Sequence, residues 1–204
     1  MPTNPDPLEL PAAEQREYGW ELANGSVETL FELPGIRVRG TTRRYEDERT
    51  RTALSEALDS AFDRTLRFFA TTRLGFEPPL PPGVGPAMVL PTLRSEAQRN
   101  FADRLRERGL TGVQRRGREQ FRSGDRTRVG LTRYAATDPL PERAGELPLE
   151  CWLGVWVGGS VNVVTAGYPT VDLASRFGLD ATPVLSRSVD EFRREFRALV
   201  RSLA

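Results

Sequence analysis

Histidine and lysine are both absent from this chain of 204 residues, so all 29 of its basic residues are arginine. Without an imidazole, Ser-His-Asp and Cys-His catalysis and histidine-ligated zinc or iron sites are excluded. Without lysine, the chain forms neither a Schiff base nor a phosphate-binding P-loop. We therefore expect no metal site and no cofactor.

Cysteine is nearly absent as well, because Cys151 is the single one. One cysteine excludes an intrachain disulfide and a thiolate metal cluster built by one chain. Its neighbours in residues 149–153 predict a buried strand, where the thiol pKa is raised and no histidine activates the sulfur. A lone thiol fits a reducing cytoplasm, which is where we expect the protein to reside.

Long hydrophobic runs are also missing. No stretch approaches the roughly 18 to 20 apolar residues that a transmembrane helix needs, and the first seven residues show no export signal. Charged residues make up 28% and hydrophobic residues 38% of the chain, a balance that favours folding in water. We expect no association with a membrane.

The domain organisation follows from composition. Residues 1–17 carry three prolines before Leu8 and then a polar stretch, which predicts a poorly ordered leader. Residues 18–204 have the length of one domain with an extended loop, and we expect a single α+β domain there.

Strand-like runs and turn residues predict three hairpins and one further strand, and helical spacing of apolar residues predicts three helices. The expected strands are residues 26–33 and 36–42, 66–76, 111–122 and 126–136, and 149–157 and 161–166. The expected helices are residues 50–62, 92–108 and 189–202. Hairpins interrupted by helices, without βαβ repeats, indicate an antiparallel sheet with the last two helices, the two main ones, packed on it.

Three of these elements carry particular signals. The hairpin of residues 149–166 is apolar on both faces, which predicts a central position covered on both sides. Ser188 and Glu191 match a capping box at the start of the last helix. Gly109 stands where a left-handed residue ends the helix of residues 92–108.

Several segments resemble a family of uncharacterised proteins from halophilic archaea. The resemblance covers most of the chain beyond Phe68 and implies no activity, so no catalytic residue carries over from it. The segments that carry it are residues 68–86, 91–97, 118–119, 124–126, 131–134, 147–156 and 166–169.

Positive charge is concentrated in one part of the sequence, since residues 93–133 hold twelve arginines against five acids. Strand alternation places Arg116, Arg118 and Arg122 on one face of the second hairpin, with Arg126 and Arg128 on the return strand. Such a patch binds phosphates of nucleic acid or another polyanion through planar guanidinium groups, or it is a solvated surface neutralised by acids elsewhere.

Two apolar features predict a surface for a ligand or partner. Trp152 and Trp156 flank Gly154 and could line a groove, although large aromatic residues in strands more often belong to a core. Leu80 and Val84 lie in the proline-rich loop of residues 78–91, which is either a binding segment or a rigid crossover packed on the sheet.

These observations favour a non-catalytic binding or assembly protein. One alternative is nucleic-acid or polyanion binding through the arginine-rich hairpin. A second is an enzyme that uses carboxylates and arginine alone, because any two acids can meet in a folded chain. A homodimer is a further partner to consider if one face of the central hairpin lacks cover. The ligand and the biological process stay open.

Overall fold

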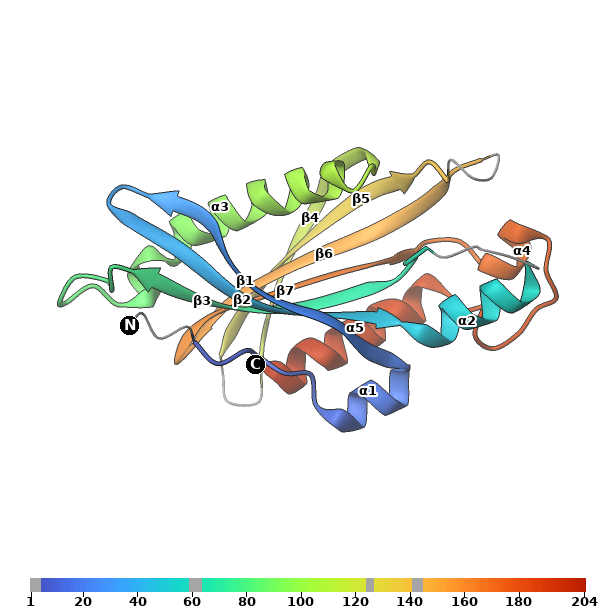
Figure 1. Cartoon of the computed structure of the whole chain (residues 1–204), viewed down its shortest axis with the longest axis horizontal. Coiled ribbons are helices and arrows are strands. Elements are labelled where there is room, and N and C mark those ends of the chain that lie inside the picture. Colours follow the sequence, from blue (N-terminus) through green and yellow to red (C-terminus); the bar gives the residue numbers. More distant parts are fainter. Residues whose placement is uncertain (1–4, 59–63, 124–126, 141–144) are drawn as a thin grey trace.

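A computed structural model describes residues 5–58, 64–123, 127–140 and 145–204, and it shows one antiparallel sheet of seven strands. Their spatial order is β1-β2-β3-β7-β6-β5-β4 (Figure 1). The predicted α+β class with an antiparallel sheet is confirmed. The strands are β1 Trp20–Leu33, β2 Ile36–Asp47, β3 Phe68–Glu77, β4 Thr111–Arg122, β5 Arg128–Asp138, β6 Leu147–Gly158 and β7 Ser160–Pro169.

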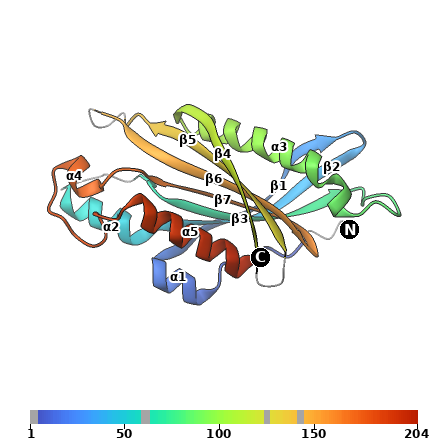
Figure 2. The same cartoon turned by 180° about the vertical axis from the view of Figure 1, so that it is seen from behind.

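Helices cover both faces of this sheet. Helix α3 lies on one face, whereas α5 and α1 lie on the other (Figures 1 and 2). The helices are α1 Ala12–Tyr18, α2 Glu48–Ala57, α3 Pro86–Glu107, α4 Leu173–Phe177 and α5 Val189–Leu203. The predicted end of α2 at Phe62 lies outside the described residues. None of the helices in the described ranges is long and apolar enough to span a membrane.

The β6–β7 hairpin is central and covered on both sides, as its two apolar faces predicted. Cys151 and Leu153 belong to the core beneath α3, while Trp152 and Trp156 belong to the core beneath α5. On the α5 side, the ring of Phe196 stacks on Trp152 with centroids 5.4 Å apart. Each face therefore has its own apolar core, and the sheet separates the two.

Helix α5 begins and packs as its sequence predicted. The Ser188 side chain accepts from the Glu191 amide, and the Glu191 carboxylate accepts from the Ser188 amide, so the capping box is complete. The apolar stripe of the helix, which includes Phe192, Phe196 and Leu199, is buried against the sheet.

Helix α3 begins earlier than predicted, at Pro86 rather than Thr92. Proline is well tolerated at a helix start, because the amide hydrogen that it lacks has no helical acceptor there. Pro91 lies within the helix and removes a single backbone donor. The predicted end is confirmed, since Gly109 has a φ of 84° and the Leu110 amide donates to the Leu105 carbonyl at 3.1 Å.

The expectation of a poorly ordered leader fails for part of the N-terminal segment. Residues 12–18 form α1, and Leu10 is only 2% exposed in the core beneath α5. The Leu10 amide donates to the Tyr45 hydroxyl at 3.0 Å, which fixes the segment to β2. Prolines predicted irregular backbone here, but two leucines, Leu8 and Leu10, supply apolar anchors that composition alone did not reveal.

A first buried ion network fastens α5 to the sheet. Arg67, just before β3, donates to both carboxylate oxygens of Glu195 at 2.9 and 3.0 Å, and it also donates to Asp47. Trp20 Nε1 donates to the same Glu195 carboxylate at 2.8 Å. The side chains of Arg67, Asp47 and Glu195 are only 2 to 3% exposed, so these charges depend on one another for stabilisation.

A second network surrounds Glu150 on β6. Arg193 of α5 donates to its two carboxylate oxygens at 2.8 and 2.7 Å, while Trp152 Nε1 and the Tyr168 hydroxyl donate at 3.0 and 2.7 Å. Burial by itself raises the pKa of Glu150, but these hydrogen bonds favour the ionised form more strongly and lower the pKa below its ordinary value. Glu150 is therefore a structural anion.

Candidate functional site

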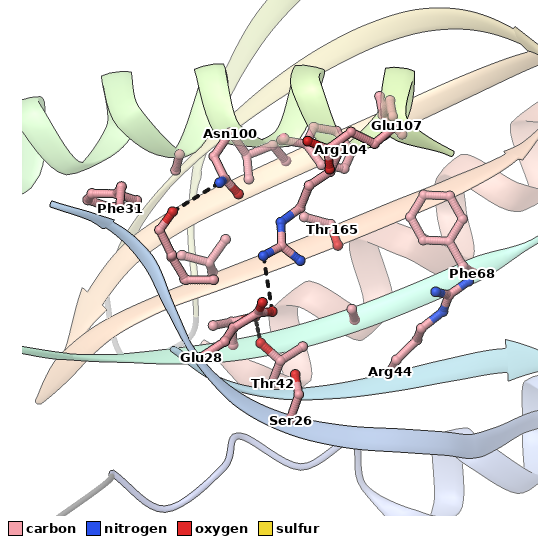
Figure 3. Close-up of a pocket in the computed structure, with 18 of the residues that line it drawn as sticks. Ser26, Glu28, Phe31, Thr42, Arg44, Phe68, Asn100, Arg104, Glu107 and Thr165 are labelled. Atoms are coloured by element: carbon pink, nitrogen blue, oxygen red, sulfur yellow. Dashed lines mark hydrogen bonds and ion pairs between the residues drawn. The ribbon is translucent and has the colours of Figure 1, made fainter. Parts of the chain in front are cut away.

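A cavity of about 340 Å³ lies between α3 and the half of the sheet that contains β1, β2 and β3 (Figure 3). Its floor is mainly apolar and comes from three adjacent strands. Phe68, Ala70 and Leu74 belong to β3, Val163 to β7 and Leu153 to β6. Because β3 residues two apart point to the same face, the alternation of the strand exposes this apolar row to the cavity.

The rim of the cavity is polar and joins β1 to α3. Arg104 of α3 forms an ion pair with Glu28 of β1 at 3.0 Å, and Asn100 donates to the Leu30 carbonyl at 3.1 Å (Figure 3). The hydroxyls of Thr42 and Thr72 are 2.9 Å apart beside them. These contacts hold the edge strand over one side of the cavity.

Two further arginines stand on the cavity wall near Phe68. The Arg108 guanidinium lies over the Phe68 ring, 4.7 Å from its centroid. Arg44 from β2 lies close to Phe68 as well (Figure 3), and its buried Nε has no hydrogen-bond partner. Among the described residues, no acid forms an ion pair with Arg108, since the neighbouring Glu46 is already paired with Arg44 at 3.3 Å.

The electrostatics of Arg108 reflect this position. Arg108 as a whole is exposed, but partial loss of water around its guanidinium and then the charge of Arg44 lower the pKa of Arg108 to about 10. The group is still charged at neutral pH, and a bound anion would stabilise that charge. The cavity thus combines an apolar floor with a cation that lacks an ion-pair partner among the described residues.

Residues 7–204 match the model of one protein family, whose description is "Domain of unknown function (DUF6517)". The chain belongs to this DUF6517 family. Comparisons with curated proteins and with solved structures give no match.

The prediction that Trp152 and Trp156 line a groove is wrong for this DUF6517 chain. Each indole is only 1% exposed, beneath α5, with Trp152 stacked on Phe196. The apolar face of α5 is buried against the sheet, and the two tryptophans supply much of the apolar surface that it contacts. Core packing, the alternative interpretation of these residues, is what the structure shows.

Leu80 and Val84 lie in the segment between β3 and α3 and are half-buried. The Val84 amide donates to the Pro81 carbonyl at 2.9 Å, which forms a turn. Neither residue lines the cavity between α3 and the sheet. Their role as a ligand or partner surface stays a prediction.

Cys151 is fully buried beneath α3, and burial raises the pKa of its thiol to about 12. The thiol is therefore protonated at neutral pH. In the described ranges, no group of three or more cysteine and carboxylate side chains is placed to hold a metal ion.

The predicted arginine patch is partly brought together. Three arginines of the β4–β5 hairpin are exposed, namely Arg118, Arg122 and Arg128. In the backbone register of the two strands, Arg122 lies opposite Arg128. Arg116 is exposed in a bulge between Arg115 and Gly117, which shifts the strand alternation. Arg126 lies outside the described residues. Arg115 takes the position on this face that simple alternation assigned to Arg116.

Sequence reasoning missed the cavity, because its residues come from six separate elements. One local signal existed in α3. Arg99 and Arg106 each have an acid three residues earlier, with which they form ion pairs at 3.0 and 2.7 Å. Arg104 and Arg108 have no acid three or four residues earlier, which left their charges available for other partners.

Proposed function

We propose that this DUF6517 chain is a non-catalytic binding protein that holds a small amphipathic anion in the cavity between α3 and the sheet. The observation that carries the proposal is Arg108, a charged guanidinium on the wall of a cavity with an apolar floor, which has no ion-pair partner among the described residues. An apolar floor with polar groups at its rim agrees with a small-molecule site, and the cavity volume of about 340 Å³ is near the lower end of the range for such sites.

The position of the charges indicates how such a ligand would lie. A carboxylate or phosphate head would accept charge-assisted hydrogen bonds from Arg108 and from the unpartnered Nε of Arg44. Its apolar part would then cover Ala70, Leu74 and Val163 on the cavity floor. The head would offset the repulsion between the two guanidinium groups.

The residues around the cavity support binding rather than catalysis. Its carboxylates belong to Glu28 and Glu107, and Glu28 is already held by Arg104. A pair of carboxylates that shares a proton or activates water needs free, neighbouring acids. Binding without covalent chemistry therefore agrees best with this arrangement.

Octanoate and octan-1-ol form a matched pair of probes, with the same chain and different head charge. Replacing Arg108→Gln should weaken octanoate binding by at least about tenfold, because a hydrogen bond to a charged group contributes about 1.5 to 3 kcal/mol. Octan-1-ol binding should change little. A ¹⁵N chemical-shift titration measures both affinities and shows whether Ala70, Leu74 and Thr165 respond.

Arg106→Gln is the matched control, because Arg106 lies only two residues before Arg108, in the last turn of α3, and is paired with Asp103 at 2.7 Å. It should bind octanoate as the wild type does. Equal loss in both variants, or octanoate-induced shifts confined to residues away from the cavity, would contradict the proposal.

A further inference from the structure

A second basic surface lies on the other side of α3 and shares no residue with the cavity. The register places Arg115 opposite Tyr134, Arg118 opposite Thr132 and Arg122 opposite Arg128. Tyr134 and Thr132 both contact Gln98 of α3, so this face of the hairpin is the face that α3 covers. We call Arg94, Arg115, Arg118, Arg122 and Arg128 the arginine face.

The charges of the arginine face have no local compensation. None of its five arginines forms an ion pair with a residue that the structure describes. Glu119, the acid between them on β4, lies on the opposite face and pairs with Arg197 of α5 at 2.8 Å. Many other arginines of the chain do have acidic partners, so this uncompensated row is a distinct feature of the surface.

Arg94 anchors a hollow of about 280 Å³ between α3 and strands β4, β5 and β6. Its Nη2 donates to the Val155 carbonyl at 3.4 Å, and its buried Nε has no hydrogen-bond partner. The guanidinium lies directly over Gly130, where a Cβ would approach it to 3.1 Å. Glycine thus leaves the space in which Arg94 sits.

Two guanidinium groups, those of Arg94 and Arg118, line this hollow. Loss of water, followed by the charges of Arg128 and Arg118, lowers the pKa of Arg94. Like charges so close to one another are stabilised when an anion lies between them. Gln98 and Thr132 add polar groups to the same hollow.

The length of the arginine face favours a polymeric anion over a single small anion as its ligand. From Arg115 to Arg122 the hairpin advances about 20 Å, at about 3.4 Å per residue of the partner strand. The exposed large hydrophobic residues in the described ranges, which are Leu22, Val27 and Met88, include no aromatic side chain on which unpaired bases could stack. A duplex offers phosphates without requiring stacking.

We propose that the arginine face binds the phosphate backbone of duplex nucleic acid, with one phosphate in the Arg94 hollow and others along β4. Such binding reads charge and shape rather than base sequence. It is independent of the small-molecule cavity, so either proposal can fail without the other.

The test is fluorescence anisotropy with a fluorescein-labelled DNA duplex of mixed sequence at several salt concentrations. The affinity should fall linearly with salt on logarithmic axes, with a slope of about 0.9 per phosphate contacted. Replacing Arg115→Gln, Arg118→Gln and Arg128→Gln together should weaken binding at low salt at least about tenfold and reduce that slope by up to about three.

Two matched triple variants complete the design. Arg37→Gln, Arg51→Gln and Arg106→Gln remove the same charge from exposed or half-exposed arginines that have acidic partners, and should leave the slope nearly unchanged. Replacing Arg115→Lys, Arg118→Lys and Arg128→Lys together should retain the slope. The proposal would be overturned if the wild type does not bind the duplex at low salt, or if both glutamine triple variants weaken binding equally. Tighter binding to single-stranded DNA or to phosphatidylserine vesicles than to the duplex would also overturn it.

Discussion

Replacing Arg67→Met should lower the free energy of unfolding by about 3–5 kcal/mol, the range observed when one partner of a buried ion pair is removed. Methionine keeps only the unbranched stem of the arginine, without the guanidinium, and Glu195 and Asp47 then stay buried as uncompensated anions. The variant also loses the guanidinium that lies over the rings of Trp20 and Phe192, at 4.8 and 4.4 Å. Urea unfolding followed by circular dichroism measures the change.

Two further variants separate charge from packing. Arg73→Met makes the same change in β3, where Arg73 is half-buried and bonded to Asn162 at 3.3 Å, and should cost less than about 1.5 kcal/mol. Adding Asp47→Asn and Glu195→Gln to Arg67→Met should recover part of the lost stability, because the stranded charges are gone and asparagine still caps α2. A triple variant less stable than Arg67→Met alone would contradict this explanation.

Replacing Glu150→Gln should lower the free energy of unfolding at neutral pH by about 1.5–3 kcal/mol, because hydrogen bonds to a charged group become neutral ones. The carboxylate of Glu150 has a lowered pKa in the folded protein, so its stabilising contribution is present above the ordinary glutamate pKa. That contribution is lost as the pH falls through the lowered value. The difference between wild type and variant should therefore shrink on acidification.

Urea unfolding at a series of acidic and neutral pH values measures this difference. Glu119→Gln is the control, since Glu119 also pairs with an arginine of α5, at 2.8 Å, but its side chain is 40% exposed. It should change stability by less than about 1 kcal/mol. A stability difference for Glu150→Gln that stays constant from neutral to strongly acidic pH would show that the charge of Glu150 contributes nothing.

The parts of the fold that sequence predicted are those set by local patterns. The capping box at Ser188, the left-handed Gly109 and the doubly apolar hairpin around Cys151 each depend on residues close in the chain. The start of α3 was misplaced because Pro86 and Pro91, only five positions apart, predicted a loop. The helix nevertheless extends through Pro91, because the burial of Leu93 and the apolar residues that follow it offsets the one backbone hydrogen-bond donor that Pro91 lacks.

The candidate site could not be predicted in the same way. Arg44 and Arg108 are far apart in sequence, and only the pairing of β2 with β3 and the path of α3 bring both to Phe68. The arginine face was predicted more closely, because β4 and β5 form a hairpin. The prediction of this face was wrong at one position, because the bulge at Arg116 shifts the alternation of side chains by one residue. Strand periodicity contains no signal for that shift.

The position of α5 has a consequence for synthesis on the ribosome. The seven strands are complete once residue 169 has been made, yet the face with Trp152 and Trp156 is covered by residues 189–203. Until those residues emerge, an assembled sheet exposes two indoles and the row around Val164 to water. The nascent chain therefore passes through a stage with a large exposed apolar surface. Chaperone binding, or a delay in the assembly of the sheet, protects the chain from aggregation at this stage.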